Sequence, residues 1–443
     1  MSRVVPSKFM SKQNVLGVES IKEIRTEKVR LLPQQHASTS YTPTGVNRIS
    51  WRIPAYANAM LDTEKSFVSF KAKMSGTGTF DASNNGVFGN NLPIFNRMVI
   101  KSSSGLVLED ISNFNVLTKL ISLLKTDEEY QIEKGIYGTT EGGSAVGALM
   151  NPTADGIVYT VQFDTGILSK NLNCYLPLMM MDGNGGMALE VELYLSSSSE
   201  CIKQIGSTAT NISYSLTDVV YNLHLLRLDE SLCSKFNQIA CDPNEQIKIP
   251  YTTYRCYTNT LQSTQNVVHV SENATNLKRL WSTFLDQTQT QAGNVLPFRG
   301  SVKESNGQRI VKYNSRVGTT YTWNEPVQET VNNNITLNYV KDSIFAKDKP
   351  LMLAKPNTDY TATRFEDDEK FFIVSNFDYS KEAMGGAVQG ISSVNPVQLE
   401  VSFDSTPSTA IVNHNFAEVG YELTVQNGQV RFVEPKPGSQ SVY

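Results

Sequence analysis

The feature that most constrains how this chain folds is a period-two alternation of apolar and polar residues, which begins near residue 48. It is clearest over residues 68–74, 157–163, 188–195 and 397–403. Successive side chains of a β-strand point to opposite faces, so each segment has one face to bury and one nearer water. Antiparallel sheets packed face to face satisfy strands of this kind. The alternation therefore predicts an all-β protein.

Turn residues agree with this interpretation. Asn306-Gly307 and Asn427-Gly428 each stand between short runs that have strand character. Both dipeptides predict tight hairpins, because the type I′ turn needs positive φ at its two central residues.

Two segments show the apolar spacing of an amphipathic helix, residues 111–124 and 276–286. Each follows a predicted strand and precedes a long polar loop. Leu117 in the first segment and Trp281 in the second are 164 residues apart. We therefore predict a β-rich unit with one inserted helix that occurs twice in the chain.

The break between the two units is predicted near residues 230–246, where a strong strand ends at about residue 228 and Asp242-Pro243 begins a turn. Residues 231–240 are a candidate short helix. With 443 residues, 40% of them hydrophobic and 19% charged, the chain has enough apolar side chains for sizeable cores. The predicted divisions are an N-terminal basic arm (1–45), a first β unit (46–230), a linker (231–246), a second β unit (247–433) and a C-terminal tail (434–443).

The charge of the chain is nearly balanced, since 39 Lys and Arg residues against 43 Asp and Glu residues give a net charge of −4. This balance argues against a protein that coats nucleic acid with its whole surface. Residues 1–30 differ, because they carry seven basic and three acidic side chains. We predict an arm that touches an anionic partner or a neighbouring subunit, with a frayed, solvated terminus as the alternative. The basic residues of the arm are Arg3, Lys8, Lys12, Lys22, Arg25, Lys28 and Arg30.

The cysteines are odd in number, with no CxxC pair, and are interpreted as single buried thiols, with a disulfide framework or zinc site as the alternative. No apolar run approaches the roughly 18–20 residues that span a bilayer. The first residues show no signal-peptide core, so we expect folding in a reducing compartment. The five cysteines are Cys174, Cys201, Cys233, Cys241 and Cys256.

Catalytic motifs are missing from the sequence. There is no phosphate-binding GK[ST] element and no GxSxG nucleophile elbow. The acidic run 366–369 lacks the glycine and the spacing of a calcium loop, and is predicted to be a solvated turn. Carboxylate pairs for glycoside hydrolysis are assembled by the fold, so the sequence leaves them open. We predict no enzymatic activity, no cofactor and no metal site.

Four stretches together resemble a known family. They are residues 92–110 (LPIFNRMVIKSSSGLVLED), 175–195 (YLPL, a loop, then MALEVELYL), 212–229 (ISYSLTDVVYNLHLLRLD) and the run from Phe371 (FFIVSNFDYS) to the final hairpin. In this order they resemble the double jelly-roll major capsid proteins of double-stranded DNA viruses, particularly those of virophages and polinton-like viruses. Adenovirus hexon is a larger relative of these proteins.

The resemblance implies two consecutive eight-stranded antiparallel jelly rolls, each with one short inserted helix. It implies a homotrimer with a pseudo-hexagonal outline, which assembles into an icosahedral shell and has no catalytic residues. The implied partners are further trimers, penton or vertex proteins, minor capsid proteins and, through the arm, genome DNA or an inner membrane. The implied location is the virion, after synthesis in the host cytoplasm or nucleus. We expect subunit contacts in the arm and in the long loops near 125–155 and 286–305.

Two alternatives remain at this stage. One is a carbohydrate-binding or carbohydrate-active β-sandwich, in which Trp51, Trp323 and Tyr321 would stack on sugars, although such aromatics more often belong to cores or interfaces. The other is a viral vertex or fibre protein, against which the presence of two jelly rolls in one chain argues.

Overall fold

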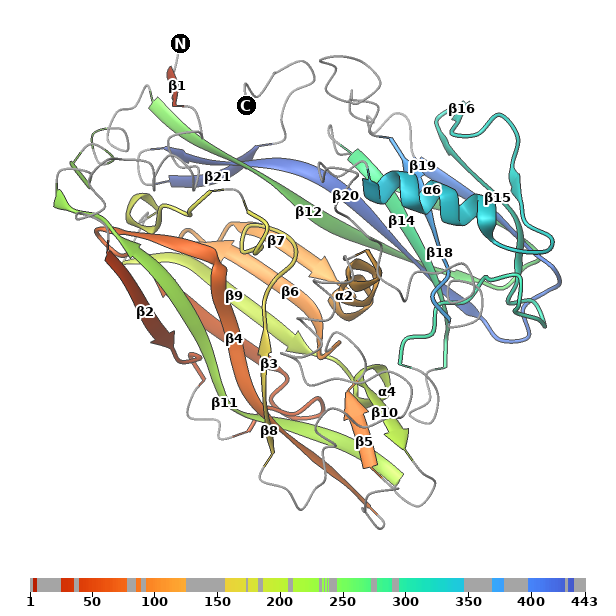
Figure 1. Cartoon of the computed structure of the whole chain (residues 1–443), viewed down its shortest axis with the longest axis horizontal. Coiled ribbons are helices and arrows are strands. Elements are labelled where there is room, and N and C mark those ends of the chain that lie inside the picture. The colour runs from red at the N-terminus through yellow and green to blue at the C-terminus, as the bar shows by residue number, and fades with distance from the viewer. Residues whose placement is uncertain are drawn as a thin grey trace.

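The structure is a computed structural model of the whole chain, in which two β-sandwiches lie side by side (Figure 1). It describes residues 3–5, 25–35, 40–77, 85–88, 93–124, 156–172, 174–181, 186–205, 210–230, 233–234, 236, 238, 245–271, 277–288, 295–345, 369–377, 397–426 and 429–433.

The first sandwich consists of two four-stranded antiparallel sheets. One sheet has the order β2 (Arg25–Leu31), β11 (Thr210–Arg227), β4 (Ala59–Thr77) and β8 (Ile157–Val161). The other has the order β3 (Arg48–Pro54), β9 (Met187–Leu195), β6 (Phe95–Ser102) and β7 (Val107–Ser112). Beside them lie a small ladder of β5 (Asn85–Phe88) with β10 (Ile202–Ile205), the helices α2 (Phe114–Leu123) and α4 (Ser198–Cys201), and the 3-10 turn η3 (Leu178–Met180).

The second sandwich is built in the same way. One sheet has the order β1 (Arg3–Val5), β12 (Glu245–Leu261), β20 (Ile411–Gln426), β14 (Leu277–Asp286) and β18 (Phe372–Asn376), with β21 (Gln429–Val433) beside β20. The other has the order β13 (Gln265–Val270), β19 (Val397–Phe403), β15 (Ile310–Val317) and β16 (Thr320–Tyr321), with β17 (Val327–Gln328) also on β15. Helix α6 (Asn334–Phe345) contacts β18.

The order of the strands identifies the fold. If the main strands of each sandwich are numbered one to eight along the chain, one sheet reads 1-8-3-6 and the other reads 2-7-4-5. In the second sandwich β16 and β17 together occupy the fifth place, and in both sandwiches the helix follows this fifth place. This is the jelly-roll connection, and it confirms the predicted fold of two jelly rolls with a helix in each.

The first strand of the first sandwich is β2, which pairs with β11 from Arg25 to Leu31. It lies within the segment 1–45 that the sequence assigns to the arm. This sandwich therefore begins before residue 46.

The predicted alternations agree with the strands and their burial. Along β4, Val68, Phe70, Ala72 and Met74 are buried while the residues between them are partly or fully exposed. Along β19, burial alternates at every residue from Val397 to Phe403. The side chains between the sheets therefore come from the apolar positions that the sequence marks.

One predicted helix is confirmed and the other is wrong. The segment 111–124 contains α2, which begins after Asn113 turns the chain with a positive φ of 52°. The segment 276–286 is not a helix but the strand β14, whose residues are almost all buried. A strand that is buried on both faces has apolar residues at positions that also match a helical period, so the pattern could not separate the two structures. The second helix is α6, which begins 220 residues after α2, at Asn334 against Phe114.

Of the two predicted hairpins, the second is confirmed by its ladder, since β20 pairs with β21 from Gln426 and Gln429 onward. Its turn residues, Asn427 and Gly428, lie outside the described residues. At the first, Asn306 and Gly307 have the expected positive φ of 58° and 80°. This turn lies in the loop before β15, however, and does not join two strands of a ladder.

A buried ion pair joins β14 to β20. Arg279 and Glu418 are opposite each other in register, their side chains are each 3% exposed, and Nη1 lies 3.0 Å from Oε1. Trp281 donates its indole N–H to the other oxygen of Glu418 at 2.8 Å. The sheet therefore contains a buried carboxylate whose charge is compensated by Arg279.

We predict that Arg279→Met lowers the free energy of unfolding by about 3–5 kcal/mol, because the Glu418 charge stays buried without its cation. The matched control is Arg97→Met, which breaks an ion pair with Asp110 whose side chains are 45% and 38% exposed. This control is expected to cost about 1 kcal/mol or less. Denaturant unfolding of both variants measures the difference, and equal losses would contradict the prediction.

Candidate assembly surfaces and the joint between the sandwiches

The predicted arm residues fall into three groups in the structure. Arg3 lies in β1, which runs parallel to the start of β12. Lys8, Lys12 and Lys22 lie outside the described residues. Arg25, Lys28 and Arg30 lie on the edge strand β2, and all of them are exposed.

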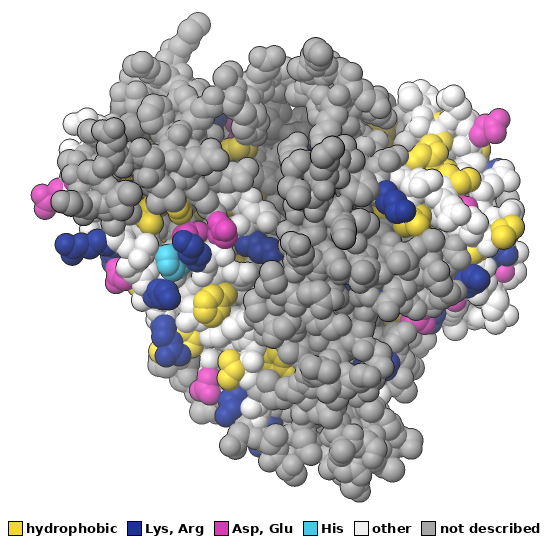
Figure 2. All heavy atoms as spheres, viewed as in Figure 1, with side chains coloured by type: hydrophobic (Ala, Val, Ile, Leu, Met, Phe, Trp, Pro, Cys, Tyr) yellow, Lys and Arg dark blue, Asp and Glu magenta, His cyan; other side chains and the backbone are white. Residues whose placement is uncertain are grey.

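Two of these residues contribute to a basic surface that the sequence did not predict. Lys28 and Arg30 pair in register with His224 and Asn222 of β11, on the side of the sheet that faces away from the core. Lys71 and Lys73 project from β4 on this same side, as the register and the alternation of burial show. We call these four cations, Lys28, Arg30, Lys71 and Lys73, the basic face. Figure 2 shows Lys and Arg side chains gathered on the side of the molecule where Figure 1 places β2, β11 and β4.

His224 lies within the basic face. Burial lowers its pKa below the usual value, the charge of Asp62 opposes this, and the charges of Lys65 and Lys28 lower it further. The imidazole is therefore neutral near pH 7, and the positive charge of the face comes from its Lys and Arg side chains.

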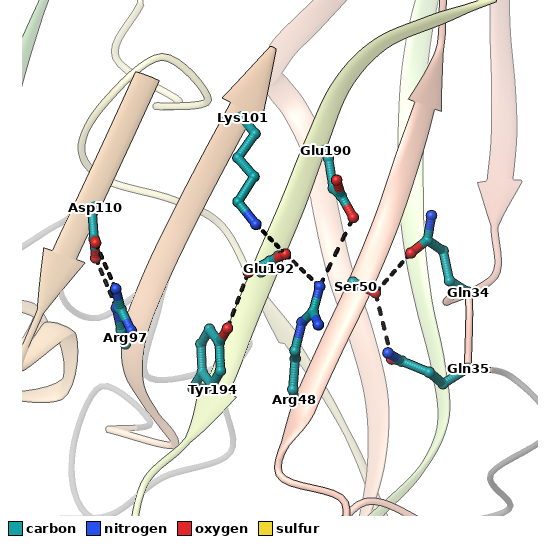
Figure 3. Close-up of polar contacts among 10 residues, drawn as sticks. All are labelled: Gln34, Gln35, Arg48, Ser50, Arg97, Lys101, Asp110, Glu190, Glu192 and Tyr194. Carbon is teal, nitrogen blue, oxygen red and sulfur yellow. Dashed lines mark hydrogen bonds and ion pairs between the residues drawn. The ribbon is translucent and has the colours of Figure 1, made fainter. Parts of the chain in front are cut away.

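The outer face of the second sheet carries a charged network centred on Glu192 (Figure 3). The Glu192 side chain is 3% exposed and accepts hydrogen bonds from Arg48, from Lys101 at 2.6 Å and from the Tyr194 hydroxyl at 3.0 Å. Burial raises the pKa of Glu192, but the hydrogen bonds from Lys101 and Tyr194 and the charges of Arg48 and Lys101 outweigh it, so the pKa is lowered.

The network continues across β6 and β7. Arg97 donates to both oxygens of Asp110, at 2.8 and 2.6 Å, and its guanidinium lies 5.6 Å from the centre of the Tyr194 ring. Each long side chain is thus held by neighbours on adjacent strands. Side chains that are already fixed lose little entropy when a partner contacts them. This face is therefore suited to contacts with another protein surface.

The two sandwiches meet where α2 and the end of β7 approach β12 and residues 295–298. Asn113 donates to the Thr258 hydroxyl at 3.2 Å. Lys119 donates to the backbone oxygens of Val295 and Leu296, at 3.0 and 2.5 Å, and its Nζ lies 4.7 Å from the centre of the Phe298 ring. We call this region, with residues 163–167, the joint.

The loop 163–167 completes the joint. The backbone N–H of Gly166 donates to the Thr252 oxygen on β12 at 3.0 Å, which links the two sandwiches directly. The next residue, Ile167, donates its backbone N–H to Glu109 Oε2 of β7 at 3.0 Å. Glu109 is buried, and burial raises its pKa to about 7, against the opposing hydrogen bonds of Thr253 and Ile167.

The aromatic residues proposed for sugar stacking are mostly interior. Trp51 is fully buried, with its ring 5.8 Å from that of Tyr221. Trp323 packs against the core, 5.5 Å from the Tyr313 ring. Tyr321, at 43% exposure, is the one of the three that reaches the surface.

Cys174, Cys201 and Cys233 are buried free thiols, Cys256 is a half-buried one, and Cys241 lies outside the described residues. In the described ranges no three His, Cys, Asp or Glu side chains are grouped to hold a metal. No helix in those ranges has the length and apolar character to cross a membrane.

Comparisons with known proteins agree with the topology. No protein-family model and no curated protein sequence matches the chain. Among solved structures, a chain of the virophage Sputnik matches with a TM-score of 0.59 and 12% identity, over 94% of this chain and 89% of that one. VP54 of PBCV-1, fitted into a reconstruction of Sputnik, matches with a TM-score of 0.58 and 10% identity, over 93% and 97%. The mavirus major capsid protein matches with a TM-score of 0.52 and 11% identity, over 94% and 91%.

These likenesses establish the class of fold. The structures matched come from viruses, among them the mavirus major capsid protein, and the match covers nearly all of both chains. This chain has the double jelly-roll fold, and the resemblance seen in its sequence is confirmed at the level of fold.

The joint was not predicted from the sequence. Its residues come from β7, α2, residues 163–167 and β12, and sequence spacing does not show that these segments meet. One sequence feature pointed to this region: Glu109 is a charged residue on the same face of β7 as the fully buried Ile111. A charged residue at an apolar position of an alternating strand often has a specific role.

We predict that Gly166→Ala destabilises the protein more than Gly105→Ala. Both glycines have φ near +80°, but a Cβ at Gly166 would lie 2.2 Å from Glu109 Oε2, whereas a Cβ at Gly105 would meet nothing within 4 Å. The control carries only the left-handed strain, about 1–2 kcal/mol. Repacking the buried Glu109 should cost about 1–3 kcal/mol more. Denaturant unfolding compares the two variants, and equal stability would mean that the joint yields easily at this point.

Proposed function

We propose that this chain is a major capsid protein, which self-assembles into homotrimeric capsomers of pseudo-hexagonal outline that build an icosahedral viral shell. The observation that carries the proposal is the twin jelly roll, which matches structures from viruses, including the mavirus major capsid protein, over 93–94% of this chain. A trimer of such a chain places six sandwiches in a ring. In this role the protein is not an enzyme, and its location is the virion after synthesis in the host cell.

The joint supports this role. A six-fold outline requires the two sandwiches of each chain to keep a fixed angle. Two sets of contacts hold that angle. One is the backbone hydrogen bond between Gly166 and Thr252, and the other is the contact of Lys119 with residues 295–298.

The outer faces support it as well. The basic face and the charged network leave two polar sheet faces on the first sandwich for contacts with other copies. Permanent subunit contacts typically bury about 2,000 Å² or more, and complementary charge chooses the partner and the register of docking. The loops 286–305 and 125–155 remain proposed contact segments, and the latter lies outside the described residues.

The oligomeric state tests the proposal. Size-exclusion chromatography with light scattering should give a mass near three times the 49.1 kDa of the chain. Negative-stain images of the same fraction should show particles with a hexagonal outline. A monomer that persists at micromolar concentration would count decisively against a shell protein.

The arm is proposed to meet an anionic partner on the inside of the shell, either genome DNA or an inner membrane. Vertex proteins and minor capsid proteins are further proposed partners. Because Arg25 opens β2, the segment to remove is residues 1–24.

We predict that deletion of residues 1–24, which also removes the three-residue edge strand β1, leaves the trimer intact but reduces the yield or stability of particles, because the trimer depends on the other strands of the sandwiches. The matched control keeps the length and removes only charge, with Gln in place of Arg3, Lys8, Lys12 and Lys22. If charge is what matters, the control reproduces the deletion, and particle stability becomes less sensitive to salt than in the unchanged chain. Normal particles from both variants would show that the arm is dispensable.

A further inference from the structure

Glu109 is a buried acid at the place where the two sandwiches meet. It lies on β7, 3% exposed, and is paired in register with Ile100 of β6. Its neighbour Asp110 points to the opposite face of the strand, where it binds Arg97. The carboxyl group of Glu109 therefore faces the joint, and the adjacent acid faces outward.

The contacts of the carboxyl group come from both sandwiches. Oε2 accepts the backbone N–H of Ile167 at 3.0 Å, and the Thr253 hydroxyl of β12 also interacts with the group. Oε1 is buried and has no hydrogen-bond partner among the described residues. Gly166 lies against the carboxyl group, so a Cβ at this position would force the Glu109 side chain to shift.

In the described part of the chain, the charged and titratable groups on the surrounding elements do not form an ion pair with Glu109. In the loop, Asp164 and Lys170 pair with each other at 3.1 Å. On β12, Arg255 donates to the Tyr421 hydroxyl, and the Tyr251 phenol has a pKa raised by burial and then by the Glu109 charge, so it stays neutral.

The remaining cations nearby have other partners. Lys278 of β14 donates to the Thr252 hydroxyl at 3.0 Å, and Lys119 of α2 binds the backbone of residues 295 and 296. Arg97 and Lys101 of β6 belong to the charged network on the outer face. Within the described residues no basic group lies at ion-pair distance from Glu109, so an ionised Glu109 would be a buried charge without a counter-ion.

We propose that Glu109 is a proton-operated latch of the joint: the two sandwiches close around the neutral acid, and ionisation of Glu109 loosens the contact between residues 163–167 and β12. This property belongs to the chain itself and does not depend on the proposed capsid role.

The closed and open joints bind the Glu109 proton with different affinities, and this difference sets the direction of the pH effect. In the closed joint the pKa of Glu109 is about 7, and in an open, hydrated joint it would be near the ordinary value of 4.5. The open form therefore gains stability relative to the closed form as pH rises from about 4.5 to about 7, by up to about tenfold in the equilibrium constant per pH unit. Above about pH 7 both forms are ionised and the effect levels off.

The latch is tested by hydrogen exchange on the full chain, measured by mass spectrometry at pH 5, 6, 7 and 8. The reporters are peptides that contain residues 163–170 and 250–256, and the matched control is Glu109→Gln, which keeps the shape but does not titrate. Comparison at equal pH removes the intrinsic pH dependence of exchange. We expect protection of the reporters in the unchanged protein to fall relative to Glu109→Gln by about tenfold or more between pH 5 and 7, then to level off. The peptide 397–403, remote from the joint, should not change.

The same pH profile in the unchanged protein and in Glu109→Gln, with both folded, would overturn the proposal. If Glu109→Gln does not fold, the proposal is tested on the unchanged protein alone. Its reporter peptides, corrected for intrinsic exchange, must lose protection relative to 397–403 between pH 5 and 7. Infrared difference spectra between pH 6 and 8 must also show loss of a protonated carboxyl band. Absence of either change would overturn the latch.

Discussion

The structure depends on burial of both faces of the central strands β20 and β14 of one sheet. Almost every described side chain of β14 and β20 is buried, whereas β4 and β19 alternate between the core and the surface. An isolated jelly roll would leave one face of such a sheet in water. Part of the cover comes from the first sandwich, since β7 contacts β12 and Gly166 bonds to Thr252. The two jelly rolls are therefore parts of one packed body.

A sheet with two buried faces explains where polar groups are found. Arg279 and Trp281 each bind one oxygen of the buried Glu418. Glu109 at the joint is enclosed with one oxygen unpartnered among the described residues. Buried polar groups of this kind are costly when a partner is missing. They make the relative placement of strands specific, and in the case of Glu109 they make it sensitive to a proton.

The first sandwich has the opposite character on its outer faces. The charged network around Glu192 and the basic face remain polar, and several of their side chains are exposed. The first sandwich covers part of the second, and its own outer faces are polar. These polar faces are available for contact with further copies of the chain. This division of the surface agrees with the fold shared with viral major capsid proteins and with the proposal of a trimeric shell unit.

The all-β class and the strands with one wet face could be predicted from the sequence, because alternation at period two is a local property of the chain. The first helix was predicted from its apolar spacing, whereas the repeat rested partly on a second helix that is the strand β14. Prediction from the sequence failed at β14, where burial on both faces produces apolar spacing that a helix also has, and it placed β2 in the arm because that exposed edge strand carries charges at most positions. The joint, the basic face and the network around Glu192 arise from the tertiary structure. Each joins residues from strands far apart in the chain, and the burial that shifts the pKa of Glu109 exists only once two sandwiches are packed together.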